Sequence, residues 1–158
     1  MTPRADDEPA AGSTGPVLLA YDGSELAEFG IEQAGSQLAP GRDALVVCVW
    51  QPADVGFLPT GNRQFDAGKA SEVRRAAEET AAHGASLAER AGFRSQSIAV
   101  QAAPTWKGIV QVAEDRQASL IVLGSHRRAG LTGHLLGSVA AAVVAHATIS
   151  VLVVHRRG

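Results

Sequence analysis

A glycine-rich, basic segment near the C-terminal end carries the clearest chemistry in this sequence. Gly124 opens the segment, Arg127 and Arg128 follow, and Gly137-Ser138 close it. Glycine lets a backbone approach a ligand closely, and a helix that begins at Ser138 would offer N–H groups to an anion. Guanidinium and hydroxyl groups also suit phosphate. The segment therefore predicts a phosphate site, although its glycines could serve only a turn and Ser138 could be only a helix cap.

A second polar turn, Asp22-Gly23-Ser24, follows the first strongly apolar run of the chain. Asp22 is the only carboxylate that we expect beside the phosphate segment. It could instead do no more than cap the helix that follows the turn.

The sequence patterns of common nucleotide-binding and hydrolytic enzymes are missing. The chain contains no G-x-x-x-x-G-K-[ST], no G-x-G-x-x-G after its first apolar run and no G-x-S-x-G. His126 and His134 share the glycine-rich segment without a carboxylate or cysteine beside them, so we expect no metal site. The only cysteine, Cys48, lies in an apolar run and is expected to be inert. We therefore expect no enzyme, with a slow ATPase or nucleotidyl transferase as the weaker alternative.

Short aliphatic runs alternate with helix-length segments along the chain, and these secondary-structure elements must position the polar residues. The runs cover residues 17–21, 44–50, 97–101, 120–123 and 149–155. The best of them are continuous instead of alternating, which is typical of strands buried on both faces. The helix-length segments give βαβ units, so we predict an α/β fold: a Rossmann-like open sandwich with a parallel sheet and helices on both faces. Ligands of such sheets bind beyond the carboxyl ends of the strands, where both polar turns fall.

We expect four helices. The first follows the Asp-Gly-Ser turn and ends near residue 39, and the second covers residues 68–91. The third and fourth begin with Thr105 and Ser138 as their caps. Gly92 is placed to end the second helix. The connection before that helix, 51–66, is long for a compact domain, and it could close over a ligand or contact another subunit.

Size and composition indicate one ordinary globular domain. The chain has 158 residues, of which 46% are hydrophobic, and a formal net charge of -2, so we expect no nucleic-acid partner and no membrane partner. Residues 1–15 hold no large aliphatic side chain after Met1, which predicts a disordered N-terminal tail and a single domain over 16–158. No signal peptide or bilayer-spanning apolar segment is evident, so a cytoplasmic location is expected.

The stretch LIVLGSHRRAGLTGHLLGSVAAAVVAHATISVLVVHRR resembles the C-terminal signature of the universal stress protein family. In nucleotide-binding members that signature reads G-x2-G-x9-G-[ST]; Gly124 supplies its first glycine here, and Gly137-Ser138 its last pair. The opening VLLAYDGSELAEFGIEQA is similar to the family's first strand and Asp-Gly-Ser turn. APTWKGIVQVAEDRQASLIVLGS is similar to its third helix and fourth strand. The likeness runs from about residue 16 to residue 156.

The resemblance implies a five-stranded parallel sheet in the order 3-2-1-4-5. It also implies a regulatory homodimer of the stress response that binds ATP or a related adenine nucleotide, with or without Mg2+, and acts through a downstream protein partner. Family members pair through the last strand, here residues 149–154. The residues that the resemblance assigns to the nucleotide are Asp22 for the ribose, Ala20 and Val49 for adenine, Leu123 and Gly124 for the sugar and first phosphate, and Gly137, Ser138 and Val139 for the phosphates.

Arg127 stands where the signature has its second glycine. Its side chain could clash where backbone should approach phosphate, or its guanidinium could bind the phosphates directly. We count Arg127 among the candidate nucleotide-binding residues because the segment stays glycine-rich and basic and Asp22 is present. The alternative is an interaction module of the same fold that binds no nucleotide, since the family also contains such members.

Overall fold

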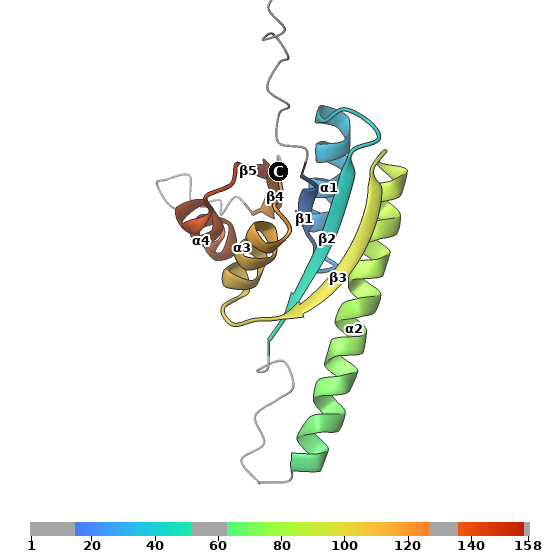
Figure 1. Cartoon of the computed structure of the whole chain (residues 1–158), viewed down its shortest axis with the longest axis vertical. Helices are drawn as coiled ribbons and strands as arrows, with labels where there is room; N and C mark the ends of the chain where they lie inside the picture. The colour runs from blue at the N-terminus through green and yellow to red at the C-terminus, as the bar shows by residue number, and fades with distance from the viewer. Residues whose placement is uncertain (1–14, 52–62, 127–135, 157–158) are drawn as a thin grey trace, which may run out of the picture.

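The computed structural model describes residues 15–51, 63–126 and 136–156, which form one parallel sheet and its helices (Figure 1). The predicted tail over 1–15 lies outside the described residues except for Gly15, and so does Arg127. In chain order the elements are β1 (Val17–Ala20), α1 (Glu25–Gln37), β2 (Asp43–Trp50), α2 (Arg63–Arg90), β3 (Arg94–Gln101), α3 (Thr105–Asp115), β4 (Leu120–Ser125), α4 (Ser138–His146) and β5 (Val151–His155).

All five strands run parallel, in the order β3-β2-β1-β4-β5, which confirms the predicted fold class and strand order. The order reverses between β1 and β4, because the chain moves outward to β3 and then returns to the other side of β1. Among the described residues, no helix is long and apolar enough to cross a membrane.

Two apolar cores lie on opposite faces of the sheet. α1 and α2 cover one face and α3 and α4 cover the other (Figure 1). Along β1, Leu19 packs in the core with α1 and α2, whereas its neighbour Leu18 packs in the core with α3 and α4. Since successive side chains of a strand point to opposite faces, a strand covered on both faces needs apolar residues throughout. This burial explains the continuous aliphatic runs.

The start of α1 corrects one interpretation of the first polar turn. Ser24 is the N-cap, and its Oγ accepts a hydrogen bond of 3.2 Å from the N–H of Ala27. Asp22 does not cap the helix; its Oδ1 accepts a hydrogen bond of 2.9 Å from the N–H of Ser24. Gly23 between them has a φ of 83°, a left-handed conformation that glycine adopts readily. The Asp-Gly-Ser order therefore builds the turn itself.

Several element boundaries differ from the expected ones. α2 begins at Arg63, inside the expected 51–66 connection, and β3 begins at Arg94, three residues before the expected start. β3 is an edge strand, so polar side chains of its first residues can reach solvent while the backbone pairs with β2. The last strand begins at Val151 instead of residue 149.

Two expected helix caps are also wrong. Thr105 and Ser138 are the first residues of α3 and α4, and the N-caps are Pro104 and Gly137, neither of which makes a side-chain cap bond. By contrast, Gly92 has a φ of 102° directly after α2, consistent with its expected role as a helix stop.

Candidate functional site

A pocket of about 360 Å³ lies at the carboxyl ends of the strands, beside the point where the strand order reverses. Eight of the nine predicted site residues line it: Ala20, Asp22, Val49, Leu123, Gly124, Gly137, Ser138 and Val139. The ninth, Arg127, lies outside the described residues. The structure therefore brings together residues from β1, β2, β4 and α4 that are more than a hundred positions apart in the chain.

Part of the pocket lining is apolar. It includes Val47 and Val49 of β2, Ile109 of α3 and Leu123 of β4. Val49 is half-buried, and its side chain would lie 3.1 Å from a Cβ placed on Gly108, so α3 packs directly against it. Flat, weakly polar rings fit such a surface because their burial removes apolar area from water.

The pocket lining also carries polar side chains. Asp22 and Ser24 belong to the turn after β1, Ser125 to the end of β4, and Ser138 to the start of α4. Asp22 and Ser138 are exposed, so both can reach a ligand without losing a buried partner. Asp22 is the one carboxylate among the described residues that line the pocket.

The beginning of α4 differs from that of α1. Ser24 caps α1, and Glu25 and Glu28 lie in its first turn. The N-cap of α4 is Gly137, which has no side chain to cap the helix, and the first turn of α4 holds no acidic residue. The first N–H groups of a helix have no partner within it, and the helix dipole favours a negative charge there. α3, which also begins at the pocket, likewise lacks a side-chain cap and an acidic residue in its first turn. The N-termini of α3 and α4, unlike that of α1, are thus open to an anion.

Ser125 is a pocket residue that sequence reasoning missed. It is 2% exposed, the one polar residue among the described ones that is buried, and its Oγ accepts a hydrogen bond of 2.8 Å from the N–H of Gly137. The Gly137 amide is thus already engaged, whereas those of Ser138 and Val139 remain for a ligand. A single hydroxyl after the aliphatic run of β4 was the available signal.

The two glycines that begin and end the signature are required for different reasons. A Cβ on Gly124 would lie 2.7 Å from the carbonyl oxygen of Leu26, so packing of α1 against β4 requires glycine there with or without a ligand. A Cβ on Gly137 would meet nothing closer than the Ser125 Oγ at 3.5 Å, and the φ of Gly137 is -55°. Contacts with the described residues therefore do not require a glycine at position 137. The absence of a side chain there leaves space beside the pocket.

A second missed residue, Thr105, lies on the pocket wall at the start of α3. Its Oγ1 accepts a hydrogen bond of 2.7 Å from Nε2 of Gln51, the residue that follows β2. This bond joins the end of β2 to the beginning of α3 at the wall of the pocket. Sequence reasoning had given Thr105 only the role of a cap.

Among the residues that the structure describes, burial raises the pKa of two side chains, Tyr21 and Cys48. Burial, followed by the nearby Glu28 carboxylate, raises the pKa of Tyr21 to about 12. The Tyr21 hydroxyl donates to Oε1 of Glu28 at 3.3 Å and lies 2.9 Å from Nδ1 of His83. Burial also raises the pKa of Cys48, which is 7% exposed and free, so its thiol stays protonated near neutral pH.

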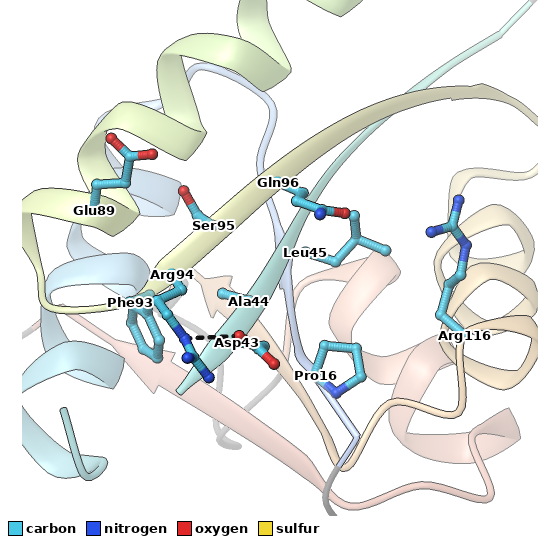
Figure 2. A pocket seen from close by; sticks show the side chains of 10 residues that line it. All are labelled: Pro16, Asp43, Ala44, Leu45, Glu89, Phe93, Arg94, Ser95, Gln96 and Arg116. Atoms are coloured by element: carbon cyan, nitrogen blue, oxygen red, sulfur yellow. Dashed lines mark ion pairs between the residues drawn. The ribbon is translucent and has the colours of Figure 1, made fainter. Parts of the chain in front are cut away.

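A larger hollow, of about 690 Å³, lies at the amino ends of the strands (Figure 2). Figure 2 shows Arg116 across this hollow from an ion pair of 3.0 Å between Arg94 and Asp43, with Leu45 and Gln96 between them. Arg116 directly follows α3, and Glu89 lies in the last turn of α2, so the helices end here instead of beginning. The C-terminus of a helix carries partial negative charge, so it disfavours a bound anion.

A model of the universal stress protein family matches residues 14–155. This chain belongs to that family. A universal stress protein of Mycolicibacterium smegmatis is 35% identical in an alignment of 157 residues that covers 96% of this chain and 49% of the relative. One from Mycobacterium tuberculosis is 35% identical in an alignment of 147 residues that covers 87% of this chain and 44% of the relative. The chain thus spans about half the length of these curated relatives.

Solved universal stress protein structures share the fold. A Methanocaldococcus jannaschii protein superposes with a TM-score of 0.74 at 24% identity, covering 92% of this chain and 99% of that one. A universal stress protein in complex with cAMP has a TM-score of 0.61 at 22% identity, covering 90% and 98%. The Archaeoglobus fulgidus protein in complex with dAMP has a TM-score of 0.53 at 21% identity, covering 88% and 96%.

Proposed function

We propose that this universal stress protein binds an adenine nucleotide, ATP or a relative of it, in the pocket at the carboxyl ends of the strands. The observation that carries the proposal is the uncapped N-terminus of α4 at a pocket that also holds apolar side chains of β2, α3 and β4. A base would pack on the apolar side chains, and phosphates would bind at the N-terminus of α4. The volume of about 360 Å³ lies within the range of small-ligand sites, about 300–1,000 Å³.

Each predicted residue has a role in this arrangement. Ala20 and Val49 contact adenine, and Leu123 and Gly124 back the sugar. The free carboxylate oxygen of Asp22 accepts hydrogen bonds from the ribose hydroxyls. Ser138 and Val139 donate N–H groups to the phosphates, and the hydroxyl of Ser138 adds a further donor. Gly137 leaves room for a phosphate, and Arg127 supplies positive charge. The complexes of two fold relatives with cAMP and dAMP support an adenine nucleotide as the ligand class.

We further propose that the bound nucleotide is sensed, not turned over. Within the described part of the pocket, no hydrogen bond joins His126 to a serine, so no activated nucleophile is formed. Asp22 is the one carboxylate available there to a Mg2+ that accompanies the phosphates, and most of the metal's ligands would be phosphate oxygens and water. A downstream protein would read whether the pocket is filled.

The proposed homodimer forms through residues 149–154. β5 is an edge strand with the half-buried apolar residues Val151, Leu152 and Val153. The N–H of Ile121 donates to the carbonyl of Ser150, so the alternate residues Val151 and Val153 direct their own N–H and C=O groups outward. An unpaired apolar edge favours pairing with a second copy. Val153→Pro removes one outward N–H and should convert a dimer to a monomer in multi-angle light scattering; an unchanged mass would contradict pairing through this edge.

Calorimetric titration with ATP and Mg2+ tests the nucleotide proposal, after mass spectrometry has shown that no nucleotide co-purified. We expect saturable binding of one nucleotide per subunit. Arg127→Gly should weaken binding about fivefold, and the loss should be larger at low salt. Arg116→Gly, at the amino ends of the strands, is the control and should leave binding unchanged. Tighter binding by Arg127→Gly would instead show that this arginine hinders the phosphates.

One observation favours the alternative, an interaction module that binds no nucleotide. Gly124 is explained by packing against Leu26 alone, so its presence does not require a ligand. Absence of binding to ATP, ADP and AMP in the same titration would support this alternative.

A further inference from the structure

α4 is held to the sheet by few groups. Ala140 and Val143 are its buried residues, and both are small. Near its last turn, the His146 ring stacks on Trp106 of α3 with 4.2 Å between ring centroids. Its first turn has no cap, so the direction of its leading N–H groups depends on whatever fixes Gly137.

Ser125 is the group that fixes Gly137. Its Oγ accepts the N–H of the N-cap residue at 2.8 Å, from a strand twelve positions earlier in the chain. In a capping box this N–H is accepted by a glutamate or glutamine in the first helical turn. Here the acceptor is part of β4, so the beginning of α4 is tied directly to the carboxyl end of the sheet.

The hydrogen bond from Gly137 to Ser125 leaves the next backbone N–H groups of α4 available to a ligand. Ser125 uses the N–H of Gly137, while those of Ser138, Val139 and Ala140 have no partner within the helix. All three residues line the pocket. Burying a hydroxyl is costly unless it is hydrogen-bonded, and an alanine at 125 would continue the apolar strand without that cost. Packing of the core therefore does not require the Ser125 hydroxyl, whereas the position of Gly137 depends on it.

We infer that Ser125 is a positioning residue that aims the first-turn amides of α4 at the phosphate end of the ligand. This inference rests on the proposed nucleotide function. It assigns Ser125 no contact with the base. Loss of the hydroxyl should therefore weaken binding of phosphates and leave binding of the nucleoside unchanged.

The test compares ATP with adenosine by calorimetric titration of the whole chain. Ser125→Ala should lower the affinity for ATP about tenfold and leave that for adenosine within about twofold. Ser119→Ala is the matched control, because the Ser119 Oγ accepts a hydrogen bond of 2.8 Å from Arg42 and donates one of 2.8 Å to the carbonyl of Gly15, at the opposite end of the sheet. It should leave both affinities unchanged. If circular dichroism shows that Ser125→Ala is unfolded, Ser125→Cys keeps the shape with a weaker acceptor and should show a smaller loss of the same kind.

The outcomes separate this inference from the function on which it rests. Equal loss of ATP and adenosine binding in the Ser125 variants, or no loss of either, would overturn the positioning role while the wild type still binds ATP. A wild type that binds neither compound would overturn the proposed function, and the inference with it.

Discussion

At the carboxyl ends of the strands this chain places glycines, hydroxyls and the beginnings of α1, α3 and α4, whereas at the amino ends it places the last turns of α2 and α3 and the pair Asp43–Arg94. The amino-end hollow is the larger, about 690 Å³ against about 360 Å³. In a parallel sheet every crossover helix runs back antiparallel to the strands, so its N-terminus lies at their carboxyl ends. The helix dipoles therefore favour an anion at the carboxyl ends and disfavour one at the amino ends, although the hollow there is larger.

Removal of a carboxylate at the carboxyl ends, compared with removal of one at the amino ends, should give the largest difference in ATP affinity. Asp22→Ala should lower the affinity for ATP roughly 10- to 100-fold, because hydrogen bonds to a charged group are stronger than neutral ones. Asp43→Ala removes an exposed carboxylate at the amino end and should leave the affinity unchanged. Isothermal titration of both variants measures the difference. Equal effects of the two changes would show that the site is misplaced.

The two signature glycines provide the next contrast. Gly124→Ala should destabilise the fold by about 1–3 kcal/mol, because the new Cβ would lie 2.7 Å from the Leu26 carbonyl oxygen and α1 would have to move. Gly137→Ala meets no such contact and should cost less, about 0.5–1 kcal/mol, because alanine is a poorer N-cap than glycine. Urea unfolding distinguishes them. If Gly137→Ala proved the more destabilising, the account of packing at both positions would be wrong.

A smaller effect concerns pH at the carboxyl end. The pKa of Tyr21 is raised to about 12 in the fold, from an ordinary value of 10.0. The folded state therefore holds this proton more tightly, and its stabilising contribution is present below pH 10 and is lost as pH rises through about 12. Between these values the urea midpoint should fall more steeply for the wild type than for Tyr21→Phe. Parallel curves for the two proteins would exclude Tyr21 as a source of this dependence.

The smallest effect is expected at the amino end. The Asp43 and Arg94 side chains are 61% and 73% exposed, so water and salt screen their ion pair. A double-mutant cycle with alanine at both positions should give a coupling of less than about 0.5 kcal/mol in urea unfolding. A coupling above about 1 kcal/mol would show that this pair contributes more than an exposed pair normally does.

The strands show how far the sequence predicts the fold. β1 and β4 are covered on both faces, so their aliphatic runs showed them clearly. The start of β3 was missed because Arg94 and Gln96 are exposed on an edge strand and give no hydrophobic signal. Local turn chemistry was similarly ambiguous. Asp22 and Ser24 are both good N-caps in isolation, and only the backbone path decides that Ser24 takes that position.

By itself the sequence determined the parallel α/β architecture, since continuous aliphatic runs and helix-length connections allow few other arrangements. It also pointed to Asp22 in the turn after β1, to Gly124 near the end of β4 and to Ser138 at the start of α4, at the edge where ligands of such sheets bind. Only the tertiary structure showed that Gly124 makes room for α1 and that Ser125 holds Gly137. Both facts depend on contacts between segments far apart in the chain. Such contacts follow from packing, which no local pattern of residues records.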